Sequence, residues 1–355
     1  MESAHQADTY AHAIRKVSLI IFLSIAMKWF KWGLAIVLFG VLVYSFLPLL
    51  SELRQAVKLF LTARWIWLLV AIFIQFLSYA SLTWLNVLAL EPFNGKIGFW
   101  NLTAVLTSMA FIQIAIPSAG LSGAALRIRL LGKFEFTPEE SLFSLVVESL
   151  YEFVALVLVS SLGIVVLLRD YNLSVQAIIV ILVLAVLSIL LIRYYWRLLQ
   201  DPERSRISVA KLVYLWNRIG GRFRCLELDD MLERLTVFQS NLTEYNDVPV
   251  WKFVLATSGK VILDIATLGA AFLLFGYAIP PGILLVGYGL ILAVGGLAAL
   301  PGGIGMADAY IPVLFSWFGV PGAVALTAGL VYRLVAYWLV RFIGFFSWQY
   351  LEKRY

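Results

Sequence analysis

The sequence predicts an all-α membrane protein that crosses the bilayer several times, and three observations support this fold class. The composition is strongly apolar, with 62% hydrophobic and 14% charged residues and a mean hydropathy of +0.92. The apolar residues form runs of about 20, the length of a helix that spans a membrane. Two runs are interrupted by proline and glycine, which break helices. We therefore expect a helical bundle with two broken or re-entrant elements.

The chain divides into a short N-terminal part and one transmembrane domain. Residues 1–32 are interpreted as a polar tail and an interfacial segment, because two lysines and two tryptophans close it in the sequence KWFKW. Residues 33–355 are interpreted as a single transmembrane domain. Within it, the polar stretch 193–252 is expected to form surface helices on the cytoplasmic side, since it is too short and too interrupted for an independent enzyme fold.

The apolar runs give the order of the spans. Residues 51–64 form an amphipathic stretch after the first span, and the run that begins at residue 283 breaks at Pro301 and turns again at Pro321. The full spans that we expect are 33–50, 65–90, 99–116, 142–168, 173–192, 253–278 and 322–350.

Most lysines and arginines lie in the loops 51–64, 117–141 and 193–252. With these spans the three loops share one face, which the positive-inside rule places in the cytoplasm. The N-terminal tail then lies outside, although Arg15 and Lys16 favour the inside. The sequence therefore leaves the orientation of the N-terminus open.

The two interruptions share one plan. The sequences PSAGLSGAALR, from residue 117, and LPGGIGMADAY, from residue 300, each contain a proline, spaced glycines and a short charged piece, and a long apolar helix follows. This likeness predicts two structural repeats, each built around a discontinuous segment, as in many transporters. Whether the repeats are parallel or inverted stays open. Proline and glycine at these positions let the backbone turn around a ligand, and the residues assigned to this role are Pro117, Gly120, Gly123, Pro301, Gly302, Gly303 and Gly305.

Ionisable residues inside the apolar spans are the candidates for a binding site. Each costs about 2.5 to 3.5 kcal/mol on insertion scales, so each needs a partner or a use. Lys260 and Asp264 lie one helical turn apart, and a structural ion pair and a functional pair are equal alternatives. The full set is Glu148, Glu152, Lys260, Asp264, Asp308, Arg333 and Arg341.

Glu148 and Glu152 also lie one turn apart, but like charges do not neutralise each other. At least one of them therefore meets a cation or stays protonated. The cations available are Arg127, Arg129, Lys260 and Arg333. A proton-coupled or cation-lined path and a buried structural network are the two interpretations that remain open.

Arg127 and Arg129 follow the expected start of a short helix, where free backbone amides favour an anion. A lipid phosphate is the anion that a membrane offers, and arginine holds phosphate in a bidentate pair. The alternative is that both are ordinary basic residues of the cytoplasmic side, which suits Arg129 better than Arg127.

Several function classes are disfavoured. The two histidines lie in the tail and the single cysteine, Cys225, has no partner for an internal disulfide. GLSG at 120–123 has the appearance of a serine protease motif, but no histidine within a span could activate Ser122. The net charge of +6 comes from basic residues beside apolar spans, which is typical of the cytoplasmic side of membrane proteins, so we expect no nucleic acid as a partner. We also expect no metal and no cofactor.

These residues resemble those of the flippase-like family, the transmembrane domain of lysylphosphatidylglycerol synthases that also occurs alone. Its second signature has a PGG-x-G turn, an acidic residue, glycine and valine, then an arginine before two aromatic residues. The matching positions are Pro301, Gly302, Gly303, Gly305, Asp308, Gly319, Val320, Arg333, Tyr337 and Trp338. The first signature matches at Pro117, Gly120, Gly123, Ala125, Leu126, Arg127 and Glu148. The chain departs from the family at Ser118, Ala119, Asp308 and Ser149, where glycine, glycine, glutamate and arginine are usual.

The resemblance implies the stand-alone form, without the soluble synthase domain. It also implies a flippase that moves a phosphate-bearing glycolipid or aminoacyl lipid across the cytoplasmic membrane. Arg127 and Arg333 would hold the phosphate, and Glu148 and Asp308 would balance charge. The alternative is an enzyme, or the membrane subunit of one, that transfers an aminoacyl or sugar group to a lipid with carboxylates as general bases. The expected partners are membrane lipids, a lipid-modifying enzyme and a second copy of the chain.

Overall fold

The computed structural model describes residues 53–116, 121–170, 249–297 and 306–354, with scattered positions between 190 and 236. The chain forms two compact units, residues 1–54 and 55–355. The second unit contains almost all described residues. The expected spans 33–50 and 173–192, and the expected boundary at residue 32, lie outside the described residues.

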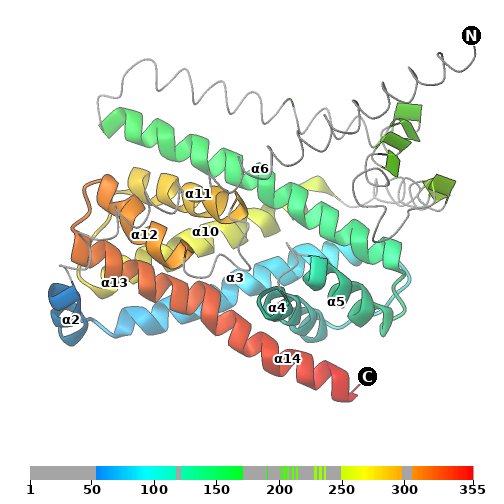
Figure 1. Cartoon of the computed structure of the whole chain (residues 1–355), viewed down its shortest axis with the longest axis horizontal. Coiled ribbons are helices and arrows are strands. Elements are labelled where there is room, and N and C mark those ends of the chain that lie inside the picture. The colour runs from blue at the N-terminus through cyan, green and yellow to red at the C-terminus, as the bar shows by residue number, and fades with distance from the viewer. Residues whose placement is uncertain are drawn as a thin grey trace, which may run out of the picture. The chain divides into compact units, whose positions relative to one another are not determined.

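All regular structure in the described residues is helical, which confirms the predicted fold class (Figure 1). Helices Ile66–Leu90, Pro138–Val166, Val250–Leu274 and Gly322–Arg354 are long and apolar enough to cross a membrane. The elements are α2 (Leu53–Leu61), α3 (Ile66–Leu90), α4 (Phe99–Ala115), α5 (Leu121–Gly132), α6 (Pro138–Asp170), α10 (Val250–Leu274), α11 (Pro281–Leu297), α12 (Met306–Trp317), α13 (Gly322–Tyr332), the π-helix η3 (Arg333–Leu339) and α14 (Val340–Arg354).

Local sequence signals fix where the helices begin and end. The backbone N–H of Glu140 donates to Thr137 Oγ1 at 3.2 Å, and the N–H of Thr137 donates to Glu140 Oε2 at 2.8 Å. This capping box, with Pro138 at the first helical position, starts α6 and sets the register of its carboxylates. Gly319 has a φ of 81° after α12, a conformation that glycine adopts without strain, and so it ends that helix.

The first break lies where the sequence predicts it, and the helices on its two sides form a hairpin. α4 ends at Ala115, and α5 begins at Leu121 and turns back along α4. The hydroxyl of Ser122 donates to the carbonyl of Ile116 at 2.9 Å. A side chain at Gly123 would collide with Gln113 of α4, so this glycine permits the close packing.

The second half repeats this hairpin. α11 ends at Leu297 and α12 begins at Met306. The hydroxyl of Tyr310, on α12, donates to the carbonyl of Ile291, on α11, at 2.6 Å. The connections between the paired helices lie outside the described residues, and so do Pro117, Gly120, Pro301, Gly302, Gly303 and Gly305.

The two halves run in opposite directions. The N–H of Arg64, just before α3, donates to the carbonyl of Leu274, at the end of α10, at 2.8 Å. Farther along, Ser81 of α3 lies against Gly259 of α10, so the two helices are antiparallel. The long helix α6 packs on α11 of the other half, and α14 packs correspondingly on α4. The sequence left the direction of the repeats open, and the structure shows that they are inverted.

This arrangement corrects the predicted sidedness. Arg64, in the loop 51–64, lies at the C-terminal end of α10, whereas Lys252 is near the start of that helix and shares a hollow with Glu91 and Lys96. Phe136 lies at the same hollow. The prediction that the loops 51–64, 117–141 and 193–252 share one face is therefore wrong. Because α5 runs back along α4, the residues that follow α5 lie on the side of Lys96 and Lys252, whereas Arg64 lies on the opposite side.

The main apolar core lies among α3, α4, α5 and the start of α6. Leu85, Leu102, Leu130 and Phe143 are fully buried there. Large apolar side chains on the outer faces of α3, α6 and α14 are exposed, as expected for surfaces that contact lipid. This apolar core therefore packs beside the buried polar side chains of the first half.

Candidate functional site

A cavity of about 430 Å³ lies between the two halves. Helices α3, α4 and α6 of the first half and α10, α11, α12, α13, η3 and α14 of the second contribute to its wall. Its polar lining residues are Gln75, Tyr79, Gln113, Glu148, Glu152, Lys260, Asp264, Tyr310, Tyr332, Arg333, Tyr337 and Arg341. The structure therefore brings together five residues of the predicted site, Glu148, Glu152, Lys260, Asp264 and Arg333, from three different elements.

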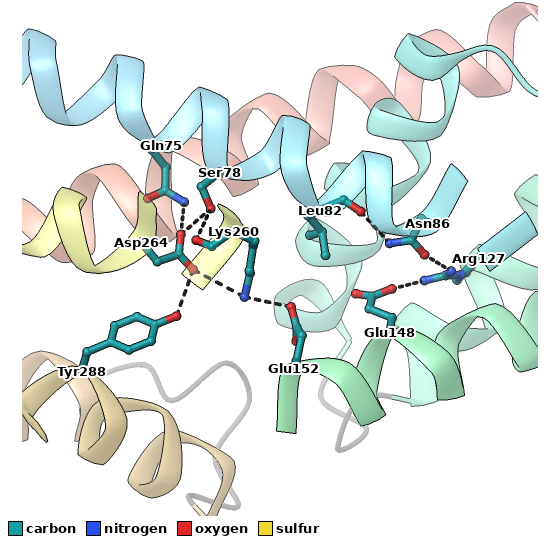
Figure 2. A network of polar contacts seen from close by, with 10 residues as sticks. All are labelled: Gln75, Ser78, Leu82, Asn86, Arg127, Glu148, Glu152, Lys260, Asp264 and Tyr288. Carbon is teal, nitrogen blue, oxygen red and sulfur yellow. Dashed lines mark hydrogen bonds and ion pairs between the residues drawn. The ribbon is translucent and has the colours of Figure 1, made fainter. Parts of the chain in front are cut away.

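Arg127 lies behind the cavity wall and is enclosed by protein. Its side chain is 1% exposed, and Nη1 contacts Glu148 Oε2 at 2.6 Å. Nη2 donates to Ser144 Oγ at 2.7 Å. It also donates to Asn86 Oδ1, as Figure 2 shows. Three elements, α3, α5 and α6, are thus tied together by one guanidinium. Its terminal nitrogens are occupied by protein groups, so Arg127 fixes the orientation of Glu148 rather than facing the cavity.

Lys260 joins two carboxylates across the cavity. Its Nζ lies 2.8 Å from Glu152 Oε1 on α6 and 3.4 Å from Asp264 Oδ2 on its own helix. Asp264 also accepts hydrogen bonds from Gln75 at 3.2 Å, Ser78 at 2.5 Å and Tyr288 at 3.1 Å (Figure 2). The pair Lys260 and Asp264 does exist, and Glu152 extends it to a chain of alternating charges.

The opposite wall carries two arginines around one tyrosine. The guanidinium carbons of Arg333 and Arg341 lie 3.7 Å and 3.3 Å from the ring centroid of Tyr337, which is a cation–π geometry. Arg341 Nη1 also donates to the carbonyl of Tyr337 at 3.0 Å. Within the described residues, Tyr337 Oη and Arg341 Nε are buried and have no hydrogen-bond partner. These groups can donate hydrogen bonds to an anion in the cavity.

Arg333 and Tyr337 lie on the π-helix η3, which interrupts the long helix from α13 to α14. A π-helical turn widens the spacing of the side chains, and such turns are frequent at functional sites. Here it places both side chains toward the cavity, while Trp338 is 40% exposed on the outer side.

Comparison with known proteins agrees with this architecture. Residues 32–344 match the family described as the lysylphosphatidylglycerol synthase TM region. The chain belongs to this family. Three curated relatives are UPF0104 membrane proteins of Methanothermobacter thermautotrophicus. One is 25% identical over 327 residues, which cover 88% of this chain and 93% of the relative. Another is 26% identical over 270 residues, covering 72% and 75%, and a third is 28% identical over 153 residues, covering 43% and 42%.

The match places this member of the lysylphosphatidylglycerol synthase TM family among multi-pass membrane proteins with a lipid-related function. The signature residues Arg333 and Tyr337 line the cavity, whereas Arg127 supports it from behind. Asp308 lies on α12, and its side chain is outside the described residues. Gly123 serves the packing of α5 on α4.

Sequence reasoning missed several cavity residues of this family member. Gln75, Tyr79, Tyr288, Tyr310 and Tyr332 were not assigned to the site, although they line the cavity or bind its charged groups. Arg341 was recognised only as a charge within a span. A signal was present, since Arg333, Tyr337 and Arg341 recur at one-turn spacing on one helical face. Within the described residues no three histidine, cysteine or acidic side chains form a group that could hold a metal ion.

Proposed function

We propose that this family member transports a phosphate-bearing lipid, with an aminoacyl or sugar headgroup, between the leaflets of the cytoplasmic membrane. One observation carries the proposal: a cavity lined by both signs of charge lies between two inverted halves of a membrane protein. Transporters with inverted repeats hold their substrate at the interface of the repeats, and rocking of the halves opens the site to each side in turn.

The wall formed by η3 and α14 supplies the phosphate site. Arg341 Nε and Tyr337 Oη are donors that protein groups leave unused among the described residues. Arginine binds phosphate oxygens through a planar fork, and a charge-assisted hydrogen bond is about twice as strong as a neutral one. Arg333, on the other face of the same ring, adds a second positive charge. The phosphate would lie beside Tyr337 and be held by these three side chains.

The outer face of the same helix suits the acyl chains. A groove of about 450 Å³ runs between α3 and the segment η3–α14, and its lining residues are Leu68, Ile72, Leu334, Val335, Trp338, Leu339 and Phe342. It is apolar throughout, as an acyl chain requires. Because Tyr337 and Trp338 are consecutive, one helix contacts the headgroup on one side and the chain on the other.

The charges at the helix ends orient the protein in the membrane. The end at which α6 begins and α14 ends carries Lys96, Arg129, Lys133, Lys252, Lys353 and Arg354, whereas Lys58 and Arg64 lie at the opposite end. By the positive-inside rule the first of these ends faces the cytoplasm. In this orientation the wall that holds Arg333 and Arg341 belongs to a helix whose C-terminus is cytoplasmic.

Reconstitution tests the proposal. The purified chain is placed in liposomes with labelled phosphatidylglycerol, an aminoacylated phosphatidylglycerol or a polyprenyl phosphate, and a membrane-impermeant quencher reports leaflet exchange. We expect faster lipid exchange with the wild type than in protein-free liposomes. The exchange rate of Arg341→Ala should be at least about tenfold lower than that of the wild type, because the phosphate loses one charged hydrogen bond. Lys353→Ala, at the end of α14, is the matched control. A folded chain that moves none of these lipids would refute transport.

The position of Glu152 favours one alternative function. Its carboxylate lies in the cavity beside Lys260, where it could act as a general base in transfer of an aminoacyl or sugar group to a lipid. Incubation with labelled aminoacyl-tRNA or sugar nucleotide, followed by chromatography of the lipids, distinguishes the two. A labelled lipid product would establish an enzyme. Association with a lipid-modifying enzyme or with a second copy remains a further proposal, which co-purification would test.

A further inference from the structure

The three carboxylates that face the cavity differ in how completely their oxygens are bound. Glu148 is held by the enclosed Arg127. Asp264 receives Lys260 and three hydrogen-bond donors from α3 and α11. Glu152 has Lys260 as its one partner among the described residues, and its side chain is 34% exposed to the cavity. Glu152 is therefore the carboxylate that can lose its negative charge without leaving several buried donors unpaired.

Lys260 makes this change of charge possible. When Glu152 is ionised, Lys260 Nζ lies between its carboxylate and that of Asp264. When a hydronium ion gives its proton to a Glu152 oxygen, the carboxyl group becomes neutral and a water molecule remains. Lys260 keeps Asp264 as its counter-ion and stays charged. The net charge of the cavity thus rises by one, which favours a phosphate on the opposite wall.

The groups around Glu152 agree with this role. The groups on the elements packed against α6 are Tyr79 of α3, Arg127 of α5, Lys260 and Asp264 of α10 and Tyr288 of α11, and Glu148 lies on α6 itself. Of these, only Lys260 contacts the Glu152 carboxylate. Glu148 lies one turn before Glu152, so the two carboxylates repel each other, and a proton on Glu152 removes that repulsion. Across the cavity, Arg333 and Arg341 supply the positive charge that a phosphate requires.

We propose that Glu152 is a proton-binding site that couples proton entry to loading of a phosphate-bearing lipid. The inference rests on the proposed lipid transport and adds the energy source. A proton and a phosphate enter the cavity together and leave together on the other side. A pH gradient therefore drives the lipid from the acidic side toward the alkaline side, and the lipid moves with the proton.

Proton uptake on binding tests this site without any transport. Phosphatidylglycerol is added to the purified protein in weakly buffered detergent, with a pH indicator, and lipid binding is measured in parallel. We expect the wild type to take up protons as it binds lipid and Glu152→Gln to take up none. The affinity of Glu152→Gln should rise about tenfold, the order of effect expected when one negative charge is removed from the same cavity at an effective dielectric constant of about 20.

Two further variants sharpen this measurement. Glu152→Asp keeps a titratable carboxyl group and should restore proton uptake in part. Glu91→Gln, at the exposed end of α3, removes a carboxylate outside the cavity and should behave as the wild type. Circular dichroism and gel filtration establish that each variant is folded. Proton uptake by Glu152→Gln equal to that of the wild type, or binding by the wild type with no uptake, would overturn the proposal.

Liposomes with a pH gradient separate this inference from the transport function. The ratio of lipid flux with and without the gradient should exceed one for the wild type and fall to about one for Glu152→Gln. If the wild type moves no lipid, the transport function fails. Two other results would refute the proton site alone. In the first, the wild type moves lipid but a sodium gradient drives the movement and a pH gradient does not. In the second, the lipid flux of Glu152→Gln responds to the pH gradient as strongly as that of the wild type.

Discussion

The two halves of the molecule share one arrangement of helices but differ in how their charges are bound. In the first half, the enclosed Arg127 forms a buried ion pair with Glu148 of the cavity wall and also donates to Asn86 and Ser144. In the second half, Arg333 occupies the long helix in the place that corresponds to Glu148, and its neighbours Tyr337 and Arg341 keep donors that no described residue binds. Protein groups bind both terminal nitrogens of Arg127 and hold the first half together, whereas Tyr337 and Arg341 of the second half present donors to a ligand.

This difference shows how an inverted repeat can make an asymmetric site. The long helix after each hairpin contributes a charge of opposite sign, so the cavity receives a negative wall from α6 and a positive wall from η3 and α14. A phosphate favours the positive wall, and the carboxylates of the other wall keep the total charge within the membrane small. Substitutions at Arg127 and its partners should therefore act mainly on stability, and substitutions at Tyr337 and Arg341 mainly on binding.

The largest effect is expected from Arg127→Ala. It leaves the Glu148 carboxylate buried without its counter-ion, which costs about 3 to 5 kcal/mol. We expect a marked fall in the thermal unfolding temperature of the detergent-solubilised protein. Arg129→Ala removes an arginine that is 64% exposed and pairs with Glu352, and it should cost less than about 1 kcal/mol. Equal unfolding temperatures for the two variants would show that the first-half network does not stabilise the fold.

Arg341→Ala should have the opposite profile. Arg341 has no carboxylate partner among the described residues, only a hydrogen bond to the Tyr337 carbonyl and the contact with the Tyr337 ring, so the unfolding temperature should fall much less than in Arg127→Ala. Binding of phosphatidylglycerol should weaken by about 10- to 100-fold, the loss of a hydrogen bond worth about 1.5 to 3 kcal/mol. Binding of an uncharged diacylglycerol, measured alongside, should not change. A loss of stability as large as that of Arg127→Ala would show that the second half is a structural network as well.

Two corresponding glycine contacts between the halves offer a symmetric pair of substitutions. Gly289 of α11 lies against Ser160 of α6, and Gly344 of α14 lies against the backbone of Thr107 on α4. Small residues let helices approach closely in membranes. Gly289→Leu and Gly344→Leu should each destabilise the protein by about 1 to 3 kcal/mol through overpacking. If only one does so in thermal unfolding, the two contacts are not equivalent and the repeat is less symmetric than the helix arrangement indicates.

The sequence predicted the fold class, the first helical break and five lining residues of the cavity. These features depend on local signals, namely apolar runs of membrane length, proline with glycine, and ionisable residues such as Glu152 and Lys260 inside those runs. It did not predict that α3 and α10 are antiparallel, because this depends on packing between residues as distant as Ser81 and Gly259. For the same reason the enclosure of Arg127 was missed. Its three partners lie on two other helices, and no local pattern records their meeting.

The smallest effect is expected from Tyr288→Phe, which removes one of the hydrogen bonds to Asp264. Asp264 keeps Lys260, Gln75 and Ser78, so the cost should be about 0.5 to 1.5 kcal/mol in thermal unfolding. Lipid binding should stay within about threefold of the wild type, since the hydroxyl contacts the saturated carboxylate and not the phosphate site. Tyr337→Phe is the matched comparison. Its hydroxyl has no partner in the described residues, so its loss should lower lipid binding more than stability. If Tyr288→Phe weakened lipid binding as strongly as Tyr337→Phe, the ligand would contact the wall that holds Asp264.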